Sequence, residues 1–199
     1  MQAGIDLGKN TKETIESLTG QMKVLKSRKL AEFYMPPRIV EEFLSFFENK
    51  NEEYVQDFLS TVIVKSPTVG TSMLPATVFY SIVDEIRKRS YRGSNIAEEE
   101  IEKAGQEMLQ QQSLDKKDFQ IKIGAFIKKF RDRYRNATRY GFLDSVADLD
   151  VIVLAKELDG TVVSTDEGVI YWARLFGVRE ALPDVWKKQL SEFALHHSE

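Results

Sequence analysis

GFLDSVADLDVIVLAKELDGTVVSTDEG, residues 141–168, is the stretch of this chain that decides both its fold and its candidate chemistry. Two strongly apolar runs, VIVLA and TVVST, alternate there with carboxylates. The acidic residues of the stretch are Asp144, Asp148, Asp150, Asp159, Asp166 and Glu167. A carboxylate beside a buried helix or strand costs free energy unless a partner neutralises it, and Mg²⁺ or Mn²⁺ is such a partner. The stretch therefore predicts a divalent-metal site on an α/β scaffold, with metal-assisted phosphodiester chemistry as the leading hypothesis.

Ordinary structural roles compete with metal binding for several of these acids. Ser145 followed by Asp148 fits a helix-capping box, and Asp144 suits a loop or an alternative cap, so for both acids either role stays open. Asp150 lies in a segment that is apolar nearly all round, which predicts a buried helix and favours a functional carboxylate. Asp166 follows the TVVST strand, where a plain turn residue is the rival. Its place at the carboxyl edge of a sheet favours function.

For the remaining acids near this edge, an ordinary structural role is the simpler interpretation. Asp159 precedes Gly160, which is typical of an exposed turn at the end of a helix. Glu41 and Glu42 follow a strand and two prolines, and one of them is expected to face the same sheet edge as Asp166. For either glutamate alone, a solvated helix face is the simpler interpretation.

Helix and strand patterns alternate along most of the chain, which predicts a parallel sheet covered by helices. Strands are predicted at 31–35, 61–64, 161–165 and 178–181, and helices at 11–28, 38–49, 146–158, 168–176 and 184–195. The segment 61–64 is ambiguous between a strand and a helix end, and we favour the strand.

A helical region without strand signals interrupts this alternation. Helices are predicted at 75–91, 95–112 and 116–139, with turns at Gly93 and at 113–115. The expected organisation is an N-terminal α/β part at 1–73, a helical insertion or hairpin at 74–140, and a C-terminal α/β part with the acidic site at 141–199.

Two basic clusters mark the helical region. The first holds Lys122, Lys128, Lys129, Arg131, Arg133, Arg135 and Arg139, and the second holds Arg87, Lys88, Arg89 and Arg92. Arg131, Arg135 and Arg139 recur every four residues, so they predict one continuous positive stripe. Such a stripe indicates a nucleic-acid phosphate partner. The alternative is a solvated face that the glutamates at 98–102 balance.

Composition excludes several classes of protein. The 199 residues carry a net charge of −3 and contain no cysteine, which excludes disulfides, zinc–thiolate sites and thiol catalysis. Two adjacent histidines, His196 and His197, give little support to a histidine triad or a His-rich metal site. The sequence contains neither a membrane-span pattern nor a signal peptide, so a cytoplasmic location is expected.

The segments AEFYMPPRIVEEF (31–43) and GFLDSVADLDVIVLAKELDGTVVSTDEGVIYWA (141–173) resemble the RNA-free, protein-only ribonuclease P family. This is the family of homologues of the Aquifex enzyme, also called RNA ligase partner proteins, and it belongs to the PIN-like metallonucleases. The resemblance covers nearly the whole chain. It implies a three-layer α/β/α core with a parallel sheet and a protruding helical hairpin. It also implies Mg²⁺-dependent endonucleolytic removal of 5′ leaders from precursor tRNA.

The resemblance also assigns residues and partners. Asp144, Asp148, Asp150 and Asp166 match the catalytic acids, Glu42 and Glu167 match further metal-site acids, and Arg131 and Arg135 match positions that hold precursor tRNA. Together with the basic patterns, it extends the expected RNA contacts to Lys128, Arg139, Arg87 and Arg89. The helical hairpin of the family mediates self-association into dimers and up to a dodecamer. Apolar positions of the helical region are candidates either for this interface or for the core of the hairpin, among them Ile101, Met108, Leu109, Phe119, Ile123, Phe126 and Ile127.

One departure from the family pattern concerns the first strand. Family members open with an apolar strand that ends in Asp followed by Thr or Ser, whereas Asp6 here precedes Leu7 and follows no adequate apolar run. The first catalytic aspartate is therefore not carried onto Asp6, and the first strand is expected to be missing. This departure motivates an alternative function, a non-catalytic RNA-binding or partner protein with a degenerate or truncated PIN-like site. A toxin-type PIN ribonuclease is a third hypothesis, against which the long helical region argues.

Overall fold

A computed structural model describes residues 11–68, 70, 73–109, 115–139, 143 and 145–196. The chain divides into two compact units, one made of Met1–Leu74 with Leu143–Glu199, the other of Pro75–Phe142. The first unit contains α1 (Thr11–Ser27), β1 (Tyr34–Met35), α2 (Pro37–Ser45), α3 (Glu53–Thr61), β2 (Ile63–Val64), α6 (Val146–Glu157), β3 (Thr161–Val163), α7 (Glu167–Leu175), β4 (Arg179–Ala181) and α8 (Pro183–His196). The second contains α4 (Ala76–Leu109) and α5 (Lys116–Arg139).

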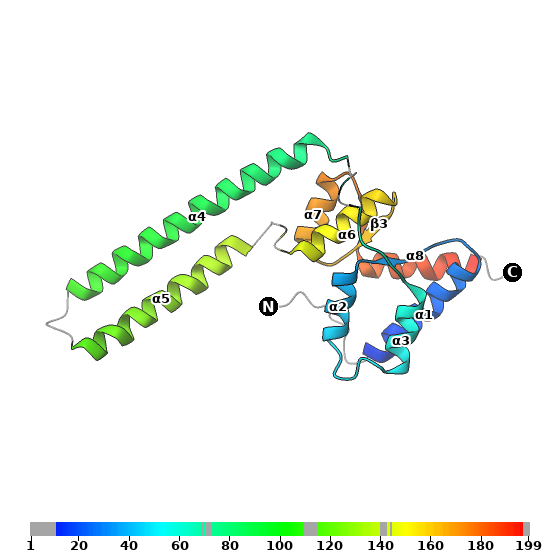
Figure 1. Cartoon of the computed structure of the whole chain (residues 1–199), viewed down its shortest axis with the longest axis horizontal. Helices are drawn as coiled ribbons and strands as arrows, with labels where there is room; N and C mark the ends of the chain where they lie inside the picture. The colour runs from blue at the N-terminus through cyan, green and yellow to red at the C-terminus, as the bar shows by residue number, and fades with distance from the viewer. Residues whose placement is uncertain are drawn as a thin grey trace. The chain divides into compact units, whose positions relative to one another are not determined.

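Helices α1, α3 and α8 pack together in the first unit (Figure 1). Apolar side chains recur along α1 at helical spacing, and Ile15, Met22 and Leu25 are all buried. Ile15 and Met22 form one core cluster with Phe58 of α3 and the neighbouring Val62. This packing depends on α3, a helix that the sequence patterns did not predict.

The strands of the first unit form two parallel pairs. Tyr34 of β1 pairs with Ile63 of β2, and Thr161 of β3 pairs with Arg179 of β4. Parallel pairing confirms an α/β fold, although the strands are two or three residues long and shorter than predicted. Within the described ranges, the two pairs do not join into one sheet. The three-layer arrangement stays a prediction.

A second cluster of buried side chains lies where α6, α7, β3 and β4 contact one another. Ile152 of α6 and Trp172 of α7 are fully buried, and Phe176, directly after α7, is almost fully buried. The predicted boundaries of α6 and α7 agree with the structure to within one residue at each end. This packing fixes the ends of α6 and α7, which carry the predicted acids.

In the second unit, α4 and α5 lie side by side (Figure 1). The predicted turn at Gly93 is wrong, because α4 continues from Ala76 to Leu109 without a break. Gly93 is buried, and the ring of Tyr134 on α5 occupies the space that a Cβ would need there. The glycine therefore permits a close approach between two helices, a role that a sequence pattern cannot separate from a turn.

Two other predictions need correction. The second helix ends at Ser45, short of the predicted Asn49. The segment 61–64 is both a helix end and a strand, since α3 ends at Thr61 and β2 begins at Ile63. No helix in the described ranges is both long and apolar enough to cross a membrane.

Candidate functional site

The start of α6 carries the first predicted acids. Ser145 is the N-cap, and its Oγ accepts a hydrogen bond from the backbone N–H of Asp148 at 3.1 Å. This confirms Ser145 as the predicted helix cap. Asp148 is half-buried in the first turn of the helix, where a carboxylate also favours the helix dipole. Asp144 lies outside the described residues.

Asp150 is a largely enclosed carboxylate on α6. Its side chain is 13% exposed, and its Oδ2 lies 2.5 Å from Nη1 of Arg38. Arg38 lies in the first turn of α2, so this ion pair links α2 to α6, which contact each other. A carboxylate this far from water needs a cationic partner, and the described structure supplies an arginine.

Asp166 is the N-cap of α7. Its Oδ1 accepts hydrogen bonds from the backbone N–H groups of Gly168 at 2.7 Å and Val169 at 3.1 Å. The Asp166 backbone N–H in turn donates to Oγ of Ser164 at 3.0 Å. The sequence placed Asp166 at the carboxyl edge of a strand, and the structure adds a capping role that fixes its orientation. Oδ2 takes no part in the cap.

The predicted acids do not converge on one metal-binding cluster. Nowhere in the described parts of the chain do three acidic or histidine side chains lie close enough together to hold a metal ion. Glu42 on α2 and Glu167 on α7 are both exposed. The described carboxylates therefore do not fit a metal ion as they stand, and Asp150 is bound to Arg38 instead.

Glu157 fixes the loop that follows β2. Its carboxylate accepts hydrogen bonds from Nζ of Lys65 at 2.8 Å and from the backbone N–H of Thr68 at 2.7 Å. These bonds lower the pKa of the Glu157 carboxyl, the Lys65 bond most strongly. The carboxyl end of β2 is thereby tied to the last turn of α6.

A charge cluster joins the two helices of the second unit. Arg133 of α5 donates to Glu100 at 2.5 Å and to Glu99 at 2.7 Å, and Glu100 is only 4% exposed. The hydrogen bonds from Arg133 lower the pKa of both glutamates. For Arg133, the structure therefore favours the interpretation in which glutamates of α4 balance the basic helix.

Arg131 and Arg135 behave differently from Arg133. Residues two positions apart on a helix point to nearly opposite sides, so a helix that turns Arg133 towards α4 turns these two away. Both are exposed, and neither forms an ion pair with any residue in the described ranges. Lys128 is exposed on the same stripe, whereas the side chain of Arg139 lies outside what the structure describes.

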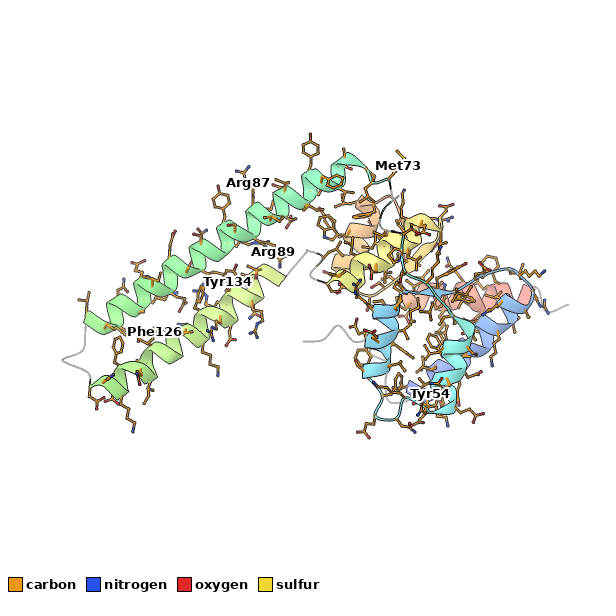
Figure 2. The ribbon with its side chains drawn as sticks, viewed as in Figure 1. Tyr54, Met73, Arg87, Arg89, Phe126 and Tyr134 are labelled. Atoms are coloured by element: carbon orange, nitrogen blue, oxygen red, sulfur yellow. The ribbon has the colours of Figure 1, made fainter. Side chains whose placement is uncertain are left out.

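The second basic cluster is split over α4. Figure 2 shows Arg87 and Arg89 on opposite sides of the helix; Arg87 is exposed and Arg89 is half-buried. One face of α4 can therefore present Arg87 to an RNA as it stands, whereas presenting both arginines on that face would require the Arg89 side chain to move.

Sequence reasoning missed Arg38, although a signal was available. A basic residue in the first turn of a helix opposes the helix dipole, and α2 has no acidic residue in that turn to compensate. An arginine in such a place indicates a specific anionic partner. The pattern could not say which acid, because Asp150 is 112 positions away.

Comparison with known proteins gives a consistent result. Residues 5–194 match a family described as PINc domain ribonuclease. A protein of Thermococcus onnurineus (strain NA1), named RNA-free ribonuclease P, is 34% identical over 172 residues, which cover 86% of this chain and 78% of the relative. The same name is given to a relative from Pyrococcus horikoshii, 37% identical over 81% of this chain and 72% of its own. It is also given to one from Archaeoglobus fulgidus, 34% identical over 94% of this chain and 86% of its own.

Proposed function

This chain belongs to the RNA-free ribonuclease P family and carries a PINc ribonuclease domain; we propose that it is a metal-dependent endoribonuclease that removes the 5′ leader of precursor tRNA. The observation that carries the proposal is the family match over residues 5–194, a range that includes every acid predicted for the site. A cytoplasmic location belongs to the same proposal.

Asp150 and Asp166 are the proposed principal ligands of Mg²⁺ or Mn²⁺. Carboxylate oxygens are the ligands that these ions prefer. Asp166 is held in one orientation by its capping bonds, and Asp150 is too enclosed to remain without a cation. Asp144, Asp148, Glu42 and Glu167 are the further candidate ligands. The described side chains would have to rearrange to gather three carboxylates, so no reaction step is assigned to the metal.

The exposed basic stripe is the proposed contact with precursor tRNA. Arg131 and Arg135, with Lys128 and Arg139, would bind phosphates along one side of α5, and Arg87 and Arg89 would add contacts from α4. Phosphate contacts position a folded RNA without reading its bases. The second unit would therefore recognise shape and charge, while the carboxylates lie in the first unit.

Self-association through the second unit is also proposed, as a dimer or a larger ring up to a dodecamer. The support is apolar exposure: Ile101 is 71% exposed and Leu109 is 88% exposed, both on α4. Sedimentation velocity of the full chain tests this proposal, with Ile101→Ser and Leu109→Ser expected to lower the mass of the assembly.

A cleavage assay on precursor tRNA with a 5′ leader tests the function. Mature 5′ ends are expected with Mg²⁺ and not with EDTA, and Asp150→Asn and Asp166→Asn should each abolish them. Asp159→Asn is the matched control, because Asp159 is an exposed turn residue at a positive φ of 48°, which asparagine tolerates. Full cleavage by both site variants would reject the site.

The alternative function is a non-catalytic RNA-binding or partner protein. The observation in its favour is that no three carboxylates converge among the described residues. Under this alternative, RNA binding depends on salt and is indifferent to EDTA, and no cleavage appears at any Mg²⁺ concentration.

A further inference from the structure

Two tyrosines of α4 expose most of their surface. Tyr80 is 78% exposed and Tyr91 is 63% exposed. Neither forms a ring contact, a hydrogen bond or an ion pair with any residue in the ranges that the structure describes. A single exposed ring is ordinary on a protein surface, whereas two bare rings on one helix face can form a binding surface.

The two tyrosines lie on one face of α4, with Arg87 between them. Positions 80, 87 and 91 are seven and four residues apart, spacings that return to the same side of an α-helix. Figure 2 shows Arg87 on the side of α4 away from α5. Glu100 is on the opposite side, because it pairs with Arg133 of α5. The face formed by Tyr80, Arg87 and Tyr91, here called the tyrosine face, is therefore not covered by α5.

The charge around the tyrosines favours an anionic partner. Basic side chains outnumber acidic ones in the segment 84–92 of α4, whereas acidic side chains predominate in the segment 98–107. The acids of the first segment, Asp84 and Glu85, lie 2.6 Å and 3.2 Å from Nζ of Lys88. Arg87 is exposed and forms no ion pair within the described ranges. The half of α4 that exposes the rings is thus also the half that attracts phosphates.

A hollow beside Tyr91 brings a ring and two cations together. It has a volume of about 370 Å³ and is lined by Glu85, Lys88, Tyr91 and Arg92. Both cations contact the one carboxylate, Lys88 at 3.2 Å and Arg92 at 3.8 Å, so the hollow keeps a positive charge. A nucleotide offers a flat base next to a phosphate, and a ring beside two cations matches both parts.

We propose that the tyrosine face binds unpaired RNA, with bases stacked on Tyr80 and Tyr91 and phosphates beside Arg87, Lys88 and Arg92. This inference rests on the proposed function in taking RNA as the ligand. The two tyrosines are about 16 Å apart along the helix axis, so each ring holds a different base of the strand. Every base has a flat π-face, so stacking adds affinity without sequence preference. The tyrosine face therefore binds bases outside the folded body of an RNA, whereas the stripe on α5 binds phosphates.

The test is a fluorescence-anisotropy titration of the full-length protein in EDTA at fixed salt, with two labelled oligonucleotides of about ten nucleotides. One is oligoadenylate, and the other has the same phosphates but no bases. Wild type should bind oligoadenylate more tightly. The double variant Tyr80→Leu, Tyr91→Leu should lose roughly ten-fold in oligoadenylate affinity for each ring and keep its affinity for the abasic strand. Tyr80→Phe with Tyr91→Phe keeps both rings and should bind as wild type does.

Phe193→Leu is the matched control, because it removes a ring that is 57% exposed on α8 of the first unit. It should leave both affinities unchanged. If the double leucine variant does not fold, the two single leucine variants replace it, each with a roughly ten-fold loss expected for oligoadenylate. Equal binding of both oligonucleotides by wild type, or an unchanged preference for oligoadenylate in the leucine variants, overturns the proposal.

The outcomes also separate this inference from the proposed function. Weaker oligoadenylate binding by the leucine variants, with no cleavage of precursor tRNA by wild type, would reject the proposed function and leave the tyrosine face standing. Cleavage by wild type with an unchanged oligoadenylate preference in the leucine variants would reject the tyrosine face alone. A leucine variant that sediments at a lower mass and keeps that preference would instead assign the face to contact between copies of the chain.

Discussion

Tyr134 of α5 lies so close to Gly93 of α4 that a Cβ on the glycine would overlap the Cε2 of the ring, with Cζ at 3.2 Å and Cδ2 at 3.3 Å from it. Gly93→Ala should therefore crowd the contact between the helices. Gly105→Ala on the same helix meets nothing within 4 Å and should gain helix propensity alone. We expect Gly93→Ala to be less stable than Gly105→Ala by about 1–2 kcal/mol in urea unfolding of the full chain.

A second variant identifies the cause of that difference. Adding Tyr134→Ala to Gly93→Ala removes the crowding, so the effect of the alanine at 93 should approach the effect at 105. Equal stability of Gly93→Ala and Gly105→Ala in the wild-type background would show that the ring moves aside without cost.

The bonds from Arg133 predict a pH dependence for the second unit. They lower the pKa of Glu99 and Glu100, and a carboxyl with a lowered folded-state pKa adds stability above its unfolded-state pKa of about 4.3. That contribution is lost as pH falls through the folded-state value. Glu100→Gln should thus lower the melting temperature at pH 7, and its deficit should shrink below about pH 4.

The matched control for this change is Glu98→Gln, at an exposed position on the same helix. It should leave the melting temperature at pH 7 close to that of wild type. A deficit of Glu100→Gln that persists unchanged at low pH would contradict the assigned role of the ionised carboxylate.

Two substitutions of Asp166 should separate its roles as cap and as site acid. Asp166→Ala loses the acceptor for the N–H groups of Gly168 and Val169 and should cost about 1 kcal/mol of stability. Asp166→Asn keeps a capping oxygen and should stay near wild-type stability. Both variants should lose cleavage of precursor tRNA. Chemical denaturation should therefore separate Asp166→Ala from Asp166→Asn, whereas the cleavage assay should not. Wild-type cleavage by Asp166→Asn would limit the residue to its cap.

The arginines of α5 should divide into two classes. The double variant Arg131→Gln, Arg135→Gln should weaken binding of precursor tRNA and reduce the slope of log K against log salt by about 0.7–0.9 for each lost contact. Arg133→Gln should leave the slope unchanged and lower thermal stability, because its partners are Glu99 and Glu100. Binding must be measured below the melting temperature of that variant. If all variants have the same slope of log K against log salt as wild type, the face of α5 that carries Arg131 and Arg135 does not contact the RNA.

Local signals predicted the parts of the fold that depend on neighbouring residues. The cap at Ser145 and the turn at Asp159, which has a positive φ of 48°, follow from side-chain chemistry within a few positions. The boundaries of α6 and α7 follow from apolar spacing and their caps. The same signals overestimated the strands, because the length of β1 depends on its pairing with β2, which lies far along the chain.

Contacts between distant segments account for what the sequence could not supply. Glycine is a residue type typical of turns, and only the close approach of the Tyr134 ring explains why Gly93 lies inside a helix instead. Arg133 belongs to the same basic run as Arg131, and only its contact with Glu100 separates the two. The sequence predicted which acids belong to the candidate site. Only the structure revealed that Arg38 is the cation that pairs with Asp150.

The division of the first unit into two sequence segments has a consequence for folding kinetics. Met1–Leu74 and Leu143–Glu199 must meet across the whole of Pro75–Phe142, which carries a loop-closure entropy cost. Contacts between α4 and α5 are local in sequence by comparison, and local contacts form faster. An antiparallel hairpin that forms early brings the ends of the insertion together and lowers the closure cost. Substitutions in the second unit that weaken the contact between α4 and α5 should therefore slow the folding of the first unit, although the substituted residues do not belong to it.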